Sequence, residues 1–109
     1  MFAQLVEAGT SGDRREEMDR IVHDQMLPAL TQEPGYAGAI NLIDRTTGNA
    51  MMLTLWHSQE QAELPIRDRG AAFLQALGSI AEISTGNRRP ISVWEVNAAT
   101  IEPWPHSSS

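Results

Sequence analysis

The sequence contains no cysteine and no lysine, and its eight basic residues are all arginines. Without cysteine, the chain has no disulfide, no thiolate metal site and no cysteine nucleophile. Fourteen acidic residues bring the formal net charge to −6, which argues against nucleic acid as a partner because phosphate binding depends on clustered cations. No apolar run approaches the roughly 20 residues of a membrane span, and the first residues lack a signal-peptide pattern. We therefore expect a cytoplasmic protein that binds neither nucleic acid nor membrane.

The 109 residues suffice for one domain. Alternating and helical apolar patterns follow one another in the order β-α-β-β-α-β, which predicts a two-layer α+β domain. We expect this domain to span residues 1–97, followed by a tail at 98–109 that is disordered or docks on a partner through Trp104. The pattern places the elements at 1–8 (strand), from about 13 to 30 (helix), 37–44 and 50–56 (strands), 58–85 (a broken helical region that Gly86 caps) and 91–97 (strand).

The central hairpin is apolar on both faces, whereas a half-exposed sheet should alternate apolar with polar residues. One face must cover the two helices. The other needs a second cover, and a second copy of the same sheet supplies it, so we predict a homodimer formed through the sheet faces. We expect the exposed face to carry Ala39, Ile43, Met52 and Trp56. The alternative is that small residues leave this face weakly apolar and solvated.

Two residues are candidates for catalysis. His23 lies one helical turn after Asp19, whose carboxylate could orient the imidazole as a base; the competing interpretation is an ion pair at the helix edge. Asn41 lies in mid-strand among apolar neighbours and needs a hydrogen-bond partner, which is either backbone or water, or a ligand oxygen. The three histidines are isolated from one another and from acidic residues at metal spacing, so we expect no metal site.

Three residues are candidates for substrate binding. Tyr36 and Trp56 could stack on a flat aromatic ligand, although such residues more often lie in a core or an interface. Arg67, together with Arg69, follows the helix break at Pro65. This stretch could form a lid that binds an anionic or enolate group, and the alternative is a solvated helix start.

The chain resembles the dimeric α/β-barrel superfamily, in particular the antibiotic-biosynthesis-monooxygenase-like domains. The residues that carry the resemblance are the turn at 34–38, the hairpin at 44–48, the strand-to-helix junction at 56–62 and the end of the last strand at 94–96. The resemblance implies a ferredoxin-like subunit with an antiparallel sheet, paired with a second subunit into a barrel, and a pocket between sheet and helices in each subunit.

The resemblance also implies a range of activities. We expect a cofactor-independent monooxygenase-like enzyme acting on a small aromatic or apolar substrate. The alternative is a non-catalytic homodimer that binds a small ligand or a partner protein. Haem degradation is disfavoured, because that branch uses an Asn on the first strand and a His in the second helical region, whereas this chain has Gln4 and no such His.

Overall fold

The computed structural model describes residues 1–85 and 91–102 of the chain. The predicted helix cap Gly86 and the predicted docking residue Trp104 lie outside the described residues. Within the part that is described, no helix is long and apolar enough to cross a membrane.

Four antiparallel strands form the main sheet, in the order β3-β4-β1-β6. The predicted α+β, ferredoxin-like order β-α-β-β-α-β is confirmed, although the last strand is shorter than predicted. These strands are β1 (Phe2–Glu7), β3 (Tyr36–Ile43), β4 (Ala50–Trp56) and β6 (Ser92–Glu95). A separate pair joins β2 (Gly9–Thr10) to β5 (Ser84–Thr85).

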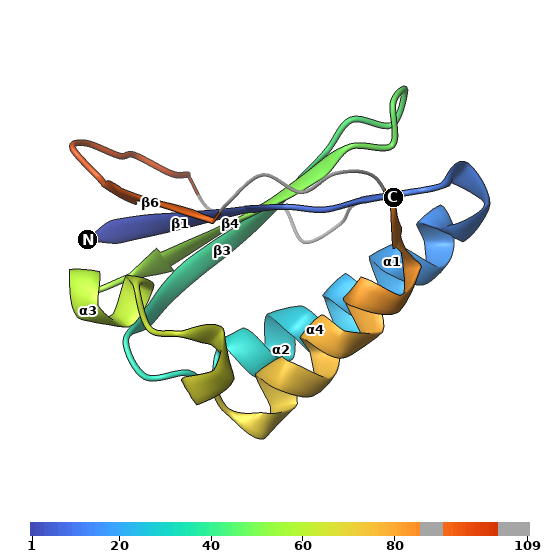
Figure 1. Ribbon diagram of the computed structural model, residues 1–109. Coiled ribbons are helices and arrows are strands. Elements are labelled where there is room, and N and C mark those ends of the chain that lie inside the picture. The colour runs from blue at the N-terminus through green and yellow to red at the C-terminus, as the bar shows by residue number, and fades with distance from the viewer. Residues whose placement is uncertain (86–90, 103–109) are drawn as a thin grey trace.

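The helices all lie on one side of this sheet (Figure 1). The first helical segment comprises η1 (Gly12–Arg14), α1 (Arg15–Ile21), η2 (Val22–Met26) and α2 (Leu27–Leu30). The second comprises α3 (Gln59–Ala62), η3 (Ile66–Asp68) and α4 (Ala71–Ile83). Ser58 caps α3 by accepting a hydrogen bond from the Gln61 amide, as its capping-box sequence predicts.

The middle of the first helical segment is a π-helix, in which the Leu27 amide donates to the Val22 carbonyl. Pro28 follows directly, and proline lacks the amide hydrogen that an α-helix needs. The wider turn places Val22 and Met26 on the sheet side, where both are buried. Single π turns of this kind are frequent at functional sites.

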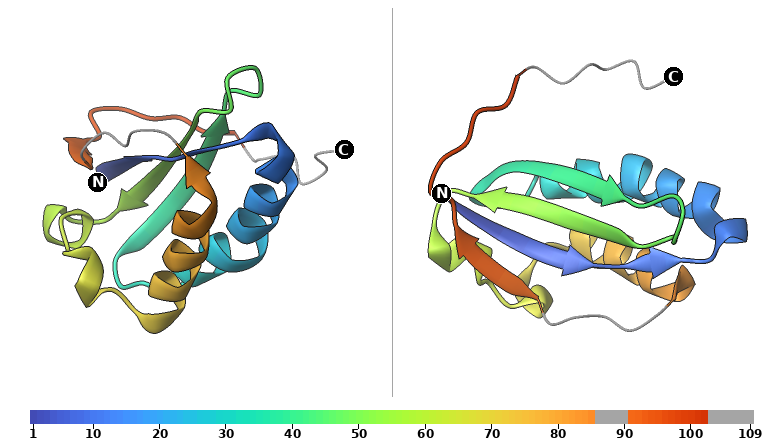
Figure 2. Two further views of the ribbon diagram at one scale, coloured as in Figure 1. Left: turned by 45° about the vertical axis from the view of Figure 1, so that its right-hand side comes forward. Right: turned by 90° about the horizontal axis from the view of Figure 1, so that it is seen from above.

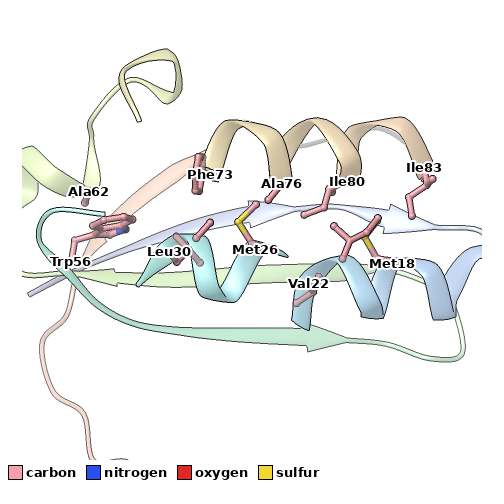
Figure 3. Close-up of a cluster of buried hydrophobic side chains, with 12 residues drawn as sticks. Met18, Val22, Met26, Leu30, Trp56, Ala62, Phe73, Ala76, Ile80 and Ile83 are labelled. Atoms are coloured by element: carbon pink, nitrogen blue, oxygen red, sulfur yellow. The ribbon is translucent and has the colours of Figure 1, made fainter. Parts of the chain in front are cut away.

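The core fills the space between the helices and one face of the sheet (Figure 3). Trp56 and Leu30 are its largest fully buried side chains. Met52 also packs against this cluster. Ala39 packs against it as well, and Ile43 is paired with Ala50, which lies on the same face of β4 as Met52 and Trp56. The prediction that Ala39, Ile43, Met52 and Trp56 lie on the face away from the helices is therefore wrong, because the helices cover the face that carries Thr54 and Trp56.

The opposite face of the sheet is also apolar, and no helix of the described residues lies over it. Seen from above in Figure 2, the strands lie in front of the helices. The strand register places Ile40 opposite Leu53, and Gly38 opposite Leu55. Leu42 is 48% exposed and Trp94 60% exposed, although both are large apolar residues. We call this surface the outer face; its residues are Leu5, Ile40, Leu42, Leu53, Leu55 and Trp94.

Candidate functional site

A cavity of about 70 Å³ lies between the sheet and the helices. Most of its lining is apolar, and four methionines line it from the first helical segment and from β4, namely Met18, Met26, Met51 and Met52. Ile66 of η3 and Phe73 of α4 also line it. Pockets for drug-sized ligands measure about 300–1,000 Å³, so a ring-shaped ligand must displace side chains. Methionine side chains are unbranched and flexible, and can move in this way.

Two buried polar side chains from the sheet line this cavity, Gln4 of β1 and Thr54 of β4. They occupy directly paired positions on the two strands. The Gln4 Nε2 donates to the Ala62 carbonyl at 3.1 Å. The Thr54 Oγ1 accepts from the Trp56 Nε1 at 2.8 Å. Neighbouring groups therefore fix the orientation of both side chains.

Three further polar residues line the cavity, Glu7, Arg15 and Asn41. Asn41 lies opposite Met52 in the register of β3 and β4, but the residue is exposed and its Nδ2 donates to the Met51 carbonyl at 3.3 Å. The Arg15 Nη2 donates to the Gly48 carbonyl at 2.7 Å, which holds this cation beside the β3–β4 turn. The cavity thus combines an apolar body with a few polar groups.

Of the five residues proposed from the sequence, only Asn41 lines the cavity. His23 is exposed on η2, and no hydrogen bond or ion pair joins it to Asp19 within the described residues. Asp19 instead lies 3.5 Å from Arg45. Arg67 is exposed on η3. The structure therefore does not bring His23 and Arg67 to the cavity with Asn41.

Trp56 and Tyr36 contact each other rather than the cavity. Their ring centroids are 6.3 Å apart in an edge-to-face arrangement. Trp56 is completely buried, so its ring faces are not open to a ligand. Tyr36 is half-buried, and this burial raises the pKa of its phenol above 10.0. In this structure both aromatic residues support the core.

Arg69 covers the other side of Trp56 instead of reaching toward a ligand. Its guanidinium carbon lies 4.0 Å from the centre of the Trp56 ring, and its side chain is completely buried. Nη2 donates to the Gln61 carbonyl at 3.0 Å. Nη1 lies 3.8 Å from the Glu33 Oε1. Arg69 therefore fits neither the predicted anion-binding lid nor the alternative of a solvated helix start, because this cation is buried against Trp56 and Glu33.

Glu33 and Arg69 also make hydrogen bonds to the backbone near Ile66, which lines the cavity. Glu33 accepts a hydrogen bond from the Gly70 amide at 3.1 Å, and the Arg69 amide donates to the Ile66 carbonyl at 3.0 Å. Burial lowers the pKa of Arg69, and the negative charge of Glu33 opposes that shift. The ion pair thus lies next in the chain to Ile66, which lines the cavity.

Four polar residues that line the cavity were not predicted as site residues, namely Gln4, Glu7, Arg15 and Thr54. The signal that singled out Asn41, a polar residue among apolar neighbours in a strand, also applies to Gln4 and Thr54. Arg15 had no such signal, because a charged residue in the first turn of a helix is usually solvated. Its approach to the cavity depends on the carbonyl of Gly48, which lies far away in the sequence.

No family model and no curated protein matches this sequence. Solved structures do match the fold. SnoaB from Streptomyces nogalater, a cofactor-independent oxygenase solved as a mutant, aligns with a TM-score of 0.70 and 12% identity over 93% of this chain and 97% of its own. A candidate antibiotic biosynthesis monooxygenase from Nitrosomonas europaea aligns with a TM-score of 0.71 and 14% identity over 90% and 100%.

A second candidate of that kind, from Bordetella bronchiseptica, aligns with a TM-score of 0.73 and 11% identity over 89% of this chain and 97% of its own. The chain has the fold of the antibiotic biosynthesis monooxygenase domain. These neighbours are members of the dimeric α/β-barrel family, so the resemblance stated from the sequence is confirmed for the fold. At these identities the likeness carries no assignment of activity.

Proposed function

We propose that this chain is a cofactor-independent, monooxygenase-like enzyme that acts on a small aromatic or apolar molecule in the cavity between sheet and helices. The observation that carries the proposal is the cavity itself, whose lining is apolar apart from a few convergent polar groups, as is typical of small-molecule sites. The activity of SnoaB, a structural neighbour, supports the choice of reaction.

In the proposed reaction, an electron-rich aromatic ring that has lost a proton supplies all the electrons. A ring carbon forms a bond to dioxygen, the O–O bond then breaks, one oxygen atom stays on the ring as a carbonyl, and the other leaves as water. For a phenol the balance is phenol plus O₂ giving quinone plus H₂O. Arg15 lines the cavity, and its positive charge would stabilise the substrate anion.

Of the residues proposed from the sequence, Asn41 remains as a polar anchor in this cavity. His23 would have to act as a base from outside it. That position favours a second candidate function, a non-catalytic homodimer that binds a small ligand or a partner protein. Within the described residues, the titratable side chains that line the cavity are Glu7 and Arg15.

We also propose that the chain forms a homodimer through the outer face. This surface is apolar, and none of the helices in the described part of the chain covers it. Isolated monomers rarely expose large contiguous apolar patches. Burying one large apolar side chain is worth about 1.5–3 kcal/mol, and the outer face presents six such residues. A second sheet packed on it would cover them all, in agreement with the dimeric family of the structural neighbours.

Two measurements on the wild-type protein separate these functions. The first is a thermal-shift screen with hydroxylated naphthalenes and anthracenes, in which a ligand at a hundred times its Kd adds about 2.7 kcal/mol of stability. The second is oxygen consumption with every compound that binds. Stabilisation with consumption of one O₂ per product supports the enzyme. Stabilisation without it supports the binding protein, and no stabilisation by any compound contradicts both.

A further inference from the structure

The cavity holds a hydrogen-bond acceptor and a hydrogen-bond donor side by side. The amide nitrogen of Gln4 is committed to the Ala62 carbonyl, so its Oε1 is the end of the amide left to accept. The hydroxyl oxygen of Thr54 accepts from the Trp56 indole, so its hydrogen is left to donate. Within the described residues, no group donates a hydrogen bond to the Gln4 Oε1, and the Thr54 hydroxyl donates to no acceptor. The two side chains are not hydrogen-bonded to each other either.

Both residues are buried, with Gln4 7% and Thr54 4% exposed. A ligand that fills the cavity excludes water from it, and a polar group that it then leaves without a partner costs free energy. Directly paired residues of an antiparallel sheet have Cβ atoms about 4.5–5.5 Å apart. One oxygen atom of a ligand can therefore reach both groups at once.

We infer that Gln4 and Thr54 together recognise a hydroxyl group on the ligand, which donates to the Gln4 Oε1 and accepts from the Thr54 hydroxyl. A hydroxyl oxygen does both. An ether or ketone oxygen can only accept, and it leaves Gln4 unpaired. This inference rests on the proposed function, and it narrows the substrate class to hydroxylated aromatic molecules whose hydroxyl enters the cavity toward the sheet.

Trp56 acts as a positioning residue for this recognition. Its indole nitrogen holds the Thr54 oxygen at 2.8 Å, and the Arg69 guanidinium, which lies over its ring, holds the ring in place. The predicted substrate-binding role of Trp56 is thereby replaced by an indirect one, through the orientation of a hydroxyl group.

The test compares 2-naphthol with 2-methylnaphthalene, whose methyl group has nearly the size of a hydroxyl but makes no hydrogen bond. The measured quantity is the ratio of their Kd values by fluorescence titration, because a ratio cancels general changes in cavity shape. Gln4→Met and Thr54→Val should each raise the Kd of 2-naphthol about tenfold relative to the Kd of 2-methylnaphthalene. This is the effect of leaving one buried hydrogen bond unmade. Thr54→Ser keeps the hydroxyl and should retain the wild-type ratio.

Met52→Leu is the matched control, since it changes an apolar lining residue and should shift both Kd values alike. An unchanged ratio in Gln4→Met and Thr54→Val, with both ligands still bound, would overturn this inference and leave the proposed function intact. If the wild-type protein binds neither compound, the proposed function fails and the inference fails with it. Should Thr54→Val not fold because the Trp56 indole loses its acceptor, Gln4→Met and Thr54→Ser still decide the outcome.

Discussion

The buried pair of Glu33 and Arg69 should make the two single substitutions at this site unequal. Glu33→Gln keeps a side-chain oxygen that can accept from the Gly70 amide but leaves the Arg69 cation buried without a counter-charge. Breaking a buried pair in this way costs about 3–5 kcal/mol. Since whole domains are stable by about 5–15 kcal/mol, this change alone should remove a large part of the stability.

Arg69→Met should lower the free energy of unfolding by less, about 1–3 kcal/mol. It removes the hydrogen bond to Gln61 and the contact with the Trp56 ring. It also removes two buried nitrogens, Nε and Nη1, that have no hydrogen-bond partner within the described residues. The Glu33 carboxylate that remains still accepts from the Gly70 amide. The double variant should be about as stable as Arg69→Met alone, because the neutral amide that replaces the Glu33 carboxylate no longer faces a cation.

Urea unfolding followed by far-ultraviolet circular dichroism measures these differences. With a slope of about 1–3 kcal/mol per molar urea, Glu33→Gln should lower the midpoint by more than about 1 M. The argument that the two charges are coupled in a site without water would be refuted by either of two results. One is an equal loss of unfolding free energy in the two single variants, and the other is a loss in the double variant that equals the sum of both.

Three further predictions test other parts of the structure. Leu53→Glu on the outer face should convert the proposed homodimer to monomer in light scattering, whereas the surface change Gln75→Glu should not; a monomeric wild type would contradict the dimer. Gly48→Ala should destabilise the protein by about 1–3 kcal/mol in urea, because Gly48 has φ 83° and an added Cβ would lie 2.8 Å from the Thr10 carbonyl oxygen; an unchanged midpoint would contradict the tight turn. Hydrogen bonds from the Thr46 and Thr47 amides lower the pKa of Asp44 below 3.8, so Asp44 stabilises the fold above that pH and loses its effect as the pH falls through its lowered pKa. The stability difference between wild type and Asp44→Ala should therefore shrink in acid, and a pH-independent difference would argue against this role.

The order of the elements could be predicted from the sequence because each signal is local. The cap at Ser58, the turn at Gly35 and the alternation along β4 depend only on nearby residues. The assignment of the sheet faces failed because both faces of the hairpin are apolar, and alternation alone does not say which face the helices cover. The fully buried Trp56 settles that point only once the tertiary structure is known.

The candidate site was harder to predict, because its members come from distant parts of the chain. Asn41 stood out as a polar residue in an apolar strand. Gln4 and Thr54 meet only through the register of β1 and β4, and the burial of Arg69 depends on Glu33, which lies far away in the sequence. Helical spacing predicts His23 at the margin of the apolar stripe, but spacing alone could not show that this residue is exposed and does not line the cavity.

Methionine methyl groups offer the most direct test of the claim that the cavity binds a small aromatic molecule. Met18, Met26, Met51 and Met52 line it, whereas Met1 is 50% exposed at the chain end and serves as an internal control. A titration of the ¹³C-methionine-labelled protein with 2-naphthol should shift the signals of the four lining residues along one common binding curve and leave Met1 unchanged. Unmoved signals for all four lining methionines at saturating naphthol would contradict the account.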